Sequence, residues 1–381
     1  REKELTEDVR KDTGVTIEPW VATSIAKAFD AVGLSYDRTE KTGVPAFTKQ
    51  FLANHENPLA QKIVKIREFN KANTTFIETI LEHSHKGRIH CDFNPLRSDE
   101  GGTVTGRFSS SNPNLQQIPA RDPEIKAMIR GLFIPEEGCK WGSFDYASQE
   151  PRWLAHYCST LKGVHRHPQI DEVVQMYHDG NADFHQMVAD IAGISRKQAK
   201  TVNLGIMYGM GRGKLAGVMD ITDEEAKELL AKYHDRVPFV KGMADMTMRR
   251  AEEVGHIRTW LGRKCRFNMW QPKSYGYSKP MPLEAAAKEY GGKAAIKRAF
   301  TYKALNRLIQ GSSADQPKKA MVDCYAEGLT PMLTVHDELC FNIESKEQAE
   351  RVAEIMTTCV PNLNIPFEVD TALVDNWGEV E

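Results

Sequence analysis

The segment from Arg196 to Gly209, RKQAKTVNLGIMYG, constrains the fold of this chain more than any other stretch. Four of its residues follow one another at intervals of four: Arg196, Lys200, Leu204 and Tyr208. Since an α-helix has 3.6 residues per turn, this spacing predicts a helix over 196–209 with these side chains on one broad stripe. A stripe with two cations at one end and an aromatic ring at the other suits a nucleoside triphosphate. The alternative is an ordinary basic amphipathic surface helix.

Length, charge and cysteine usage limit the class of protein. A chain of 381 residues is too long for one ordinary core, so two or three domains or subdomains are expected. The formal net charge is −2, so nucleic-acid binding would need local basic patches, and residues 194–214 supply one without any acid. The seven cysteines are scattered without a CxxC pair, which argues against disulfides or zinc and favours a reducing cytosol. There is no signal peptide and no apolar run near the length of a membrane span.

Periodicity and breaker residues divide the chain into helical, strand-like and irregular parts. Apolar residues predict a long amphipathic helix over 58–83, whose polar side offers lysines that could grip DNA in addition to packing in a bundle. Gly, Ser, Asn and Pro predict a loop over 101–121. The other predictions are a strand over 139–146, helices over 183–233 interrupted at 209–213, an irregular or hairpin-like stretch over 254–282, helix over 284–326, and two strands joined by a tight acidic turn over 331–343.

Two aspartates stand where predicted strands end. Asp145 closes CKWGSFDY, and Asp337 lies in the turn of the predicted hairpin. Isolated aspartates at such positions are commonly turn formers or caps. Two carboxylates on neighbouring strands can instead bridge two Mg²⁺ ions, which accept few protein carboxylates and complete their shells with phosphate oxygens and water. One ion would then activate a 3′-hydroxyl and the other would neutralise the leaving pyrophosphate, while Arg196 and Lys200 hold the triphosphate.

Five blocks of sequence together resemble family A DNA polymerases, the DNA polymerase I type. DYASQEPR at 145–152, RKQAKTVNLGIMYG at 196–209 and VHDEL at 335–339 resemble the three polymerase motifs, in the family's order. TGRFSSSNPNLQQIP at 105–119 resembles the block ahead of the first motif, and NRLIQGSSAD at 306–315 resembles the helix ahead of the third. The resemblance covers nearly the whole chain, and five ordered blocks are much more specific than any one of them.

The resemblance implies a metal centre. Asp145 and Asp337 match the metal-binding aspartates, and the carbonyl of Tyr146 would be an additional ligand. Glu338 matches the second acid of the third motif, an auxiliary catalytic residue near the site. The implied cofactor is Mg²⁺, as two ions, with Mn²⁺ as a substitute.

The resemblance also implies a nucleotide site. Arg196, Lys200 and His185 match groups that contact the incoming phosphates. Glu150 matches a steric gate that crowds a ribose 2′-hydroxyl and pairs, in the family, with the tyrosine matched by Tyr208. Without the motif order, His185 would be an ordinary core histidine.

Contacts to DNA are implied at five further positions. The residues that match primer or template contacts, or a basic residue near the DNA, are Arg107, Arg121, Asn306, Gln310 and His336. Taken alone, Arg107 could be a surface residue of a Ser/Asn loop, and Asn306 and Gln310 could be ordinary polar positions of a helix.

The implied fold is a mixed α+β right hand with an antiparallel palm sheet, helical fingers and a helical thumb. The expected boundaries are thumb 1–105, first part of the palm 106–160, fingers 161–295 and second part of the palm 296–381. The implied partners are primer-template DNA and dNTPs, with no membrane, a monomeric core, and room for a separate proofreading, helicase or processivity partner. The implied location is the cytoplasm of a bacterial or phage-infected cell, with an organelle as the alternative.

Three departures from the family pattern stand out. The first motif usually reads DYSQIELR, and here Pro151 lacks an amide donor, so it should lie in the first turn of the following helix. Leu204 replaces an aromatic residue that faces the nucleotide sugar, which predicts discrimination against dideoxynucleotides because no side-chain hydroxyl can replace the missing 3′-hydroxyl. No acidic DxE-type motif precedes the thumb-like region, which predicts a chain without a 3′–5′ exonuclease. These departures suggest a phage or divergent replicase.

The sequence therefore predicts a template-directed DNA polymerase that extends a primer 3′ end by a two-metal-ion mechanism. The nearest rival is a single-subunit RNA polymerase of the phage type, against which the gate residue Glu150 argues. A rival from another class is a non-catalytic DNA-binding module, against which the intact aspartates and the cationic stripe argue. Reverse transcription stays open as a side activity.

Overall fold

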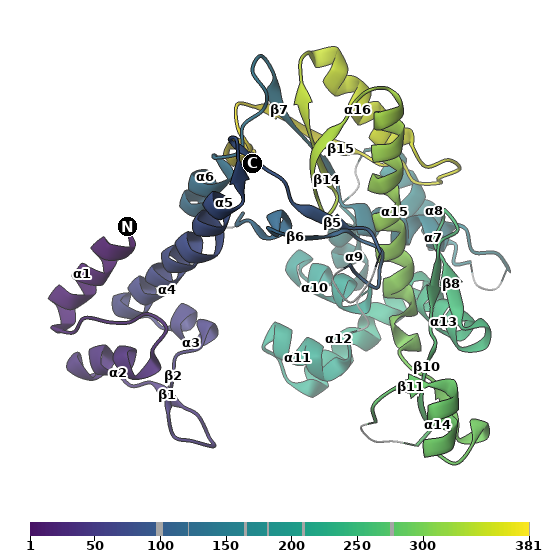
Figure 1. Cartoon of the computed structure of the whole chain (residues 1–381). Coiled ribbons are helices and arrows are strands. Elements are labelled where there is room, and N and C mark those ends of the chain that lie inside the picture. The colour runs from purple at the N-terminus through teal and green to yellow at the C-terminus, as the bar shows by residue number, and fades with distance from the viewer. Residues whose placement is uncertain are drawn as a thin grey trace.

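The computed structural model describes residues 1–96, 102–120, 122–163, 166–180, 183–207, 210–274 and 278–380. Their buried apolar side chains form three clusters, one in the N-terminal unit, one large cluster in the main body and one at the base between them. Figure 1 shows the N-terminal helical unit standing apart from the body that contains the main sheet. None of the described helices is both long enough and apolar enough to cross a membrane.

A four-stranded antiparallel sheet organises the body, with strand order β13-β14-β7-β15. Its strands are β7 (Lys140–Tyr146), β13 (Pro331–Val335), β14 (Glu338–Ile343) and β15 (Val369–Val374). The predicted strand at 139–146 and the predicted hairpin at 331–343 are confirmed. Strand β15, which completes the sheet, was not predicted.

The two faces of this sheet pack against different parts of the chain, because alternate side chains of a strand point to opposite faces. Phe144 and Phe341 belong to the large cluster, which includes residues of the helices α7 (Gln149–Ser159), α15 (Ala304–Ala326) and α16 (Lys346–Thr358). On the other face Trp141 stacks on Trp377, with ring centroids 5.8 Å apart, beside α6 (Pro123–Arg130). Both faces of the sheet are thus covered by packed side chains.

The N-terminal unit is helical, and its own core includes Ile25, Phe29 and Leu52. The predicted helix over 58–83 is a helical run in three parts, because a π-helical stretch over Ala72–Ile77 separates two α-helices. Asn57 caps its start and Pro58 occupies its first turn. The elements of this unit are α1 (Glu2–Thr13), α2 (Ala22–Ala31), α3 (Lys49–Asn54), α4 (Pro58–Lys71), α5 (Glu78–Glu82), β1 (Asp37–Arg38) and β2 (Pro45–Ala46).

The stretch that connects this unit to the body carries short strands. The loop predicted over 101–121 is wrong at Ser109–Ser111, because these residues form a strand that pairs with Asp92–Asn94. These strands are β3 (Ser84–His85), β4 (Arg88–Ile89), β5 (Asp92–Asn94) and β6 (Ser109–Ser111).

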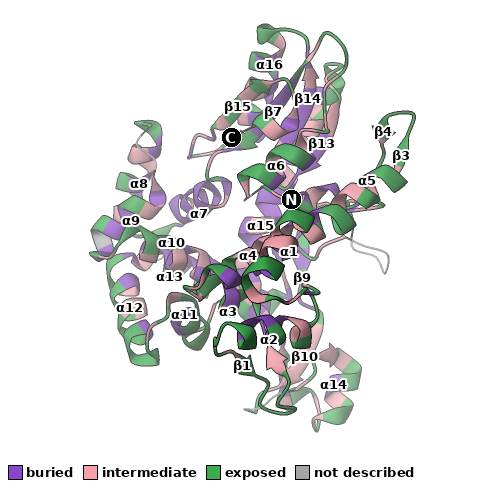
Figure 2. Ribbon diagram, turned by 90° about the vertical axis from the view of Figure 1, so that its left-hand side faces the viewer, coloured by how far each residue is buried: buried purple, intermediate pink, exposed green. Residues whose placement is uncertain are grey.

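Helix α7, in which every residue except Glu150 is buried, packs against α8 (Gln169–His178), α13 (Pro238–Val254) and α15 (Figure 2). In its described residues the expected helical stretch over 183–233 comprises four helices, and it is broken at 193–195 and 220–222 as well as at 210–211. The helices of this region are α8 (Gln169–His178), α9 (Phe184–Ala192), α10 (Arg196–Met207), α11 (Arg212–Met219), α12 (Asp223–Arg236) and α13 (Pro238–Val254).

The region before α15 differs from the prediction. The irregular or hairpin-like stretch over 254–282 is confirmed, and the predicted helix over 284–326 is helical at both ends but wrong between Tyr290 and Lys303. A short helix at its start is followed by a strand that pairs with an earlier strand, and α15 begins only at Ala304. The elements are β8 (His256–Arg258), β9 (Lys264–Arg266), β10 (Met269–Pro272), β11 (Met281–Pro282), α14 (Leu283–Glu289) and β12 (Ile296–Arg298).

Candidate active site

Four acidic residues meet at one end of the main sheet. Asp145, next to the last residue of β7, is paired in register with Glu338 on β14 and with Asp370 on β15. Directly paired residues of a sheet project to the same face, so these three carboxylates form one row, and like charges in such a row destabilise the fold. Asp337 lies beside the row, in the two-residue turn between β13 and β14. Asp370 is an acid that the sequence interpretation missed.

Both turns that carry this acidic end have unusual backbone. His336, in the β13–β14 turn, has a φ of 58°, and Ser148, between β7 and α7, has a φ of 51°. Residues other than glycine seldom adopt this left-handed region, and where they do the surrounding structure must enforce it. The tight turn at Ser148 sends the chain from the end of β7 directly into α7, which places Glu150 next to the acids.

The neighbouring carboxylates perturb one another. Desolvation, followed by the charges of Asp337, Glu338 and Asp370, raises the pKa of Asp145 to about 7. Because Asp145 is exposed, water weakens the effect of burial, and the three neighbouring carboxylates account for much of the rise in its pKa. Desolvation likewise raises the pKa of Asp337, although its own backbone and Arg107 act in the opposite direction. Negative charge is therefore concentrated here, because the carboxylates outnumber the arginines that act on them, Arg107 at Asp337 and Arg130 at Glu338.

These carboxylates suit Mg²⁺, which takes few ligands from the protein, better than a metal ion whose ligands all come from the protein. Among the described residues, no group of three or more His, Cys, Asp or Glu side chains is placed to hold a metal by itself. Mg²⁺ needs only one or two protein carboxylates when phosphate oxygens and water complete its shell. Asp145 and Asp337 can supply those carboxylates at a position open to solvent.

The remaining residues of this end are held by contacts of their own. Ser143 Oγ donates to the carboxylate of Glu338 at 2.6 Å, so this acid is tied to the sheet surface. The ring of Tyr146 is buried and its hydroxyl donates to the Met356 carbonyl at 2.7 Å. His336 is exposed on the turn.

Glu150 is paired with Arg107. The Nη2 atom of Arg107 lies 2.7 Å from the Oε1 atom of Glu150, and their side chains are only 25% and 12% exposed. The sequence placed Arg107 among the contacts to DNA, and its pairing with Glu150 was not predicted. Pro151 lies in the first turn of α7, as predicted. Tyr208, the expected partner of Glu150, and Arg121 lie outside the described residues.

The cationic stripe lies on α10, as the spacing predicts. Arg196 is exposed and pairs with Asp183, with 2.7 Å between Nε and Oδ2. Lys200, one turn later, is exposed and has no acidic partner within the described part of the chain. Leu204 is half-buried and packs against the large cluster. Helix α10 thus carries two exposed cations, Arg196 and Lys200, followed one turn later by the half-buried Leu204.

Two hydrogen bonds through the buried side chains of Tyr233 and Asn203, which were not predicted from the sequence, orient His185. The hydroxyl of Tyr233 donates to Oδ1 of Asn203 at 2.6 Å, and Nδ2 of Asn203 lies 3.0 Å from Nδ1 of His185. Desolvation lowers the pKa of His185, and the charges of Lys200 and Arg196 lower it further, although Asp183 opposes them. The neutral ring therefore accepts at Nδ1 and carries its proton on Nε2.

Comparison with known proteins identifies the family. A sequence model described as DNA polymerase family A matches residues 4–379. The chain belongs to DNA polymerase family A. It is 36% identical over 426 aligned residues to a DNA-directed DNA polymerase of Pseudomonas phage M6, covering 99% of this chain and 60% of that protein.

Two other family A polymerases match this chain over at least 92% of its length. Thermostable DNA polymerase I of Thermus aquaticus is 32% identical over 92% of this chain and 40% of its own length. The polymerase domain of Pol1 from M. smegmatis, solved in complex with DNA primer-template and dNTP, matches with a TM-score of 0.73 and 27% identity, over 99% of this chain and 64% of that chain. The chain thus spans 60% and 40% of the lengths of the two curated relatives named here.

Within this family A fold, the structure brings most predicted site residues to two places. The acids lie at the end of the sheet, next to the Arg107–Glu150 pair, and Arg196, Lys200, Leu204 and His185 lie on the neighbouring helices α9 and α10. Asn306 and Gln310 are half-buried, one turn apart near the start of α15.

Proposed function

We propose that this chain is a template-directed DNA polymerase that adds dNTPs to the 3′ end of a primer. The observation that carries the proposal is the meeting of Asp145 and Asp337 at the end of the sheet, within electrostatic reach of each other. Residues 1–105 would serve as thumb, 106–160 and 296–381 as palm, and 161–295 as fingers. The proposal assigns synthesis, and no 3′–5′ exonuclease step, to these residues.

Two divalent metal ions are proposed as the cofactor, with Asp145, Asp337 and the Tyr146 carbonyl as their protein ligands. When bound, Mg²⁺, or Mn²⁺ in its place, would make the primer 3′-hydroxyl more acidic and neutralise the leaving pyrophosphate. The concentrated negative charge of the acid row supports this assignment, because a cation would relieve it. Glu338, tied to Ser143, would shape the electrostatic field without being a ligand.

The residues of α9 and α10 are proposed to bind the triphosphate. Arg196 would exchange its exposed pairing with Asp183 for phosphate oxygens, and Lys200 would add a second cation. His185 would donate from Nε2, because its Nδ1 is already occupied by Asn203. Nothing in this arrangement forms a covalent intermediate, so catalysis would rest on positioning and charge.

Selection of the sugar is proposed to lie with Glu150 and Leu204. Arg107 fixes the Glu150 carboxylate, and a fixed carboxylate would crowd a ribose 2′-hydroxyl more effectively than a mobile one. Leu204 offers no hydroxyl to replace a missing 3′-hydroxyl. Asn306, Gln310, His336 and Arg121 are proposed as contacts to the primer-template.

Primer extension on a defined template with Mg²⁺ tests the proposal, using dNTPs, rNTPs and dideoxynucleotides side by side. We expect efficient extension with dNTPs, little with rNTPs and poor use of dideoxynucleotides. Extension with rNTPs alone would instead favour an RNA polymerase. Equal use of dideoxy- and deoxynucleotides would contradict the role given to Leu204. Binding without any extension would favour a non-catalytic module.

A further inference from the structure

An arginine in the turn of the β8–β9 hairpin, Arg263, bonds to two other segments of the chain. Its Nε atom lies 2.6 Å from Oδ1 of Asp315 on α15, and its Nη2 atom donates to the carbonyls of Thr105 and Gly311 at 2.6 and 2.9 Å. Hydrogen bonds from a charged donor are about twice as strong as neutral ones. Arg263 therefore joins the hairpin, α15 and the loop before β6.

Two glycines allow this close approach. Gly106 has a φ of 89°, and a Cβ atom there would lie 2.5 Å from Cζ of Arg263. A Cβ atom at Gly311 would lie 3.0 Å from Nη2 of Arg263 and 2.8 Å from Cγ2 of Thr259. These distances are well below the roughly 3.5–4.0 Å at which carbon atoms pack without a bond. A side chain at Gly106 would displace the guanidinium from its acceptors or the loop from the guanidinium.

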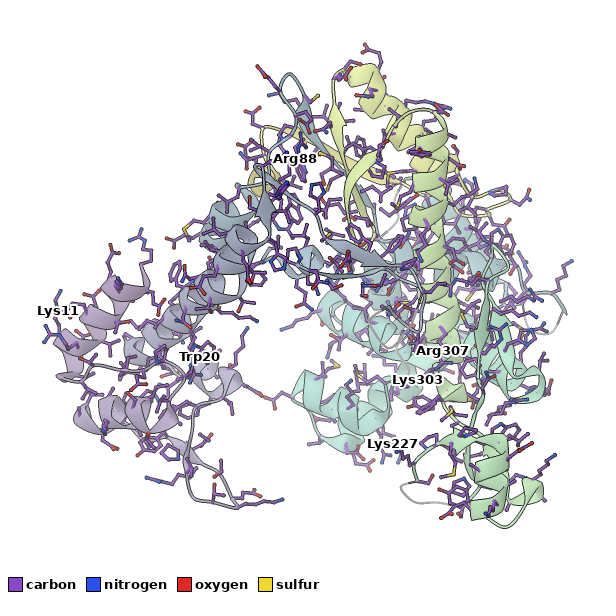
Figure 3. All side chains as sticks on the ribbon, viewed as in Figure 1. Lys11, Trp20, Arg88, Lys227, Lys303 and Arg307 are labelled. Atoms are coloured by element: carbon purple, nitrogen blue, oxygen red, sulfur yellow. The ribbon has the colours of Figure 1, made fainter. Side chains whose placement is uncertain are left out.

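The main chain at Arg263 is fixed as well. Its amide donates to the hydroxyl of Thr259 at 3.0 Å, and its carbonyl accepts from the amide of Thr259 at 3.0 Å. The strand β9 that follows contacts α15. Figure 3 labels Arg307, which lies one turn before Gly311 on α15 and donates to the carbonyl of Arg266 on β9 at 2.8 Å. The side chain of Arg263 thus extends from a turn that is held on α15.

This arrangement determines where Arg107 leaves the loop. Arg107 follows Gly106 directly, and its Nη2 atom lies 2.7 Å from Oε1 of Glu150. On its other side, the ammonium group of Lys318 on α15 lies 4.3 Å from the ring centroid of Phe108. The loop is therefore tied to α15 on both sides of Arg107.

Glu150 is placed relative to the same helix. It lies in the first turn of α7, which packs against α15, and Nε1 of Trp153 on α7 donates to Oε1 of Gln316 on α15 at 3.0 Å. Helix α15 is thus the common support of the Arg107–Glu150 pair. Since Glu150 reaches α15 without Arg263, a change at Arg263 would shift Arg107 relative to Glu150.

A second arginine has the same kind of environment away from the proposed site. Arg298 on β12 donates to the carbonyls of Glu252 and Phe267 at 3.2 and 3.0 Å. A Cβ atom at Gly255, whose φ is 77°, would lie 2.6 Å from Cζ of Arg298. These bonds join β12 to α13 and to the segment that follows β9. Arg298 is therefore a matched case of an arginine that maintains the fold.

We propose that Arg263 is a positioning residue, which holds Arg107 against Glu150 and so increases discrimination against rNTPs. The inference rests on the proposed function, in which Glu150 is the gate. Arg263 acts through Arg107 and contacts neither the nucleotide nor a metal ion. A lysine in its place would keep the charge, but it lacks the planar fork that serves one carboxylate and two carbonyls together.

The test measures single-nucleotide insertion of dNTP and of rNTP by Arg263→Lys and by Gly106→Ala. Discrimination is the ratio of the two kcat/KM values. The matched controls are Arg298→Lys and Gly255→Ala, which alter the same kinds of contact elsewhere. Glu150→Ala is made alone and in combination with Arg263→Lys, and the Tm of every protein is measured.

We expect Arg263→Lys and Gly106→Ala to lower the discrimination about fivefold, the effect of one ordinary hydrogen bond. The controls should lose a similar amount of stability and keep the wild-type ratio, because unfolding lowers the use of both nucleotides equally. In the Glu150→Ala background Arg263→Lys should change the ratio no further, since residues that act through one contact are not additive.

A wild-type ratio in either folded variant would overturn the proposal, and so would an equal loss in the controls or an undiminished effect in the Glu150→Ala background. If one of the two variants does not fold, the other decides. A wild-type ratio in Glu150→Ala itself would contradict the gate, and this inference with it. A wild type that inserts no dNTP would instead contradict the polymerase function.

Discussion

The acidic end of the main sheet and the cationic stripe of α10 differ in charge and in how the fold holds them. The acids are fixed by strand register, since Asp145 is paired on both sides along β7. The cations project from one face of a helix into solvent, and the only ion pair of Arg196 among the described residues is its exposed pair with Asp183. The acids are pre-positioned, whereas the cations are free to change partners.

The difference indicates which charged groups of the site must be held rigidly. Charge that must act on the reacting atoms benefits from a site that does not reorganise, because reorganisation adds to the barrier. Charge that captures a mobile triphosphate can begin in an exposed ion pair, since such pairs are worth only about 0–1 kcal/mol and are easily exchanged. Variants of the α10 stripe, of Glu150, of the acid row and of the hydrogen bonds to His185 test that division.

Loss of the Lys200 cation should weaken capture of the nucleotide. Lys200→Ala removes a charge-assisted contact worth about 1.5–3 kcal/mol, so kcat/KM for dNTP should fall about 10- to 150-fold, mainly through KM. Lys197→Ala is the matched control, because Lys197 is exposed on the same helix but lies off the stripe. Steady-state kinetics on one primer-template measures both. Equal losses in the two variants would mean that only the general charge of α10 matters.

Opening the gate should admit ribonucleotides. Glu150→Ala removes the side chain that Arg107 fixes, and we expect discrimination against rNTPs to decrease about 10- to 100-fold, the range expected for a small steric difference in a pocket. Glu150→Gln keeps the size and removes the charge, so it should retain most of the discrimination. Competition between dNTP and rNTP in single-nucleotide insertion measures the ratio. If both variants discriminate as the wild type does, Glu150 is not the gate.

The acid row should reduce stability as pH rises when no divalent cation is present. The pKa of Asp145 is raised in the folded state, so the folded protein binds this proton more tightly than the unfolded chain, and stability falls between about pH 4 and the folded pKa of about 7. Asp145→Asn should therefore melt a few degrees above the wild type at about pH 8 in EDTA, with a difference that shrinks toward about pH 4.

Calorimetry with and without Mg²⁺ checks this prediction. Mg²⁺ should raise the Tm of the wild type and have little effect on Asp145→Asn. Asp375→Asn serves as the control, because Asp375 is an exposed acid paired with Lys140, away from the row. A lower Tm for Asp145→Asn at every pH would contradict the repulsion that we infer.

The hydrogen bonds through Tyr233 and Asn203 to His185 should have the smallest effect. Tyr233→Phe removes the hydroxyl that orients Asn203, a hydrogen bond worth about 1 kcal/mol, so we expect about a fivefold loss in kcat/KM for dNTP. The pH dependence of kcat/KM should also shift, because His185 could then exchange its tautomers. Tyr157→Phe is the control, since it removes a buried tyrosine hydroxyl bonded to Ser312 instead. Identical pH profiles for the wild type, Tyr233→Phe and Tyr157→Phe would contradict a role of His185 in nucleotide binding.

Local patterns were enough to predict the two motif-bearing strand segments and the α10 stripe. Asp145 and Asp337 stand at the ends of short apolar runs, and Arg196, Lys200 and Leu204 share a helical period, so neighbouring residues carry the information. The first turn of α7 was likewise predictable, because the ring of Pro151 restricts where in a helix it can lie.

Pairings between distant segments could not be predicted in this way. Asp370 joins the acid row through strand register across a separation of 225 residues, and Arg107 meets Glu150 across 43. The error over 284–326 has the same origin. Residues 290–303 include helix-favouring alanines and lysines, but pairing with β10 makes Ile296–Arg298 a strand.

We propose that Asp145 and Asp337 act in catalysis, whereas other residues bind DNA. The most direct test is single-turnover primer extension by Asp145→Asn and Asp337→Asn, with primer-template affinity measured on the same preparations. The account predicts that each variant loses extension by on the order of a thousandfold and keeps its DNA affinity within a few-fold. Extension retained by both variants would contradict it.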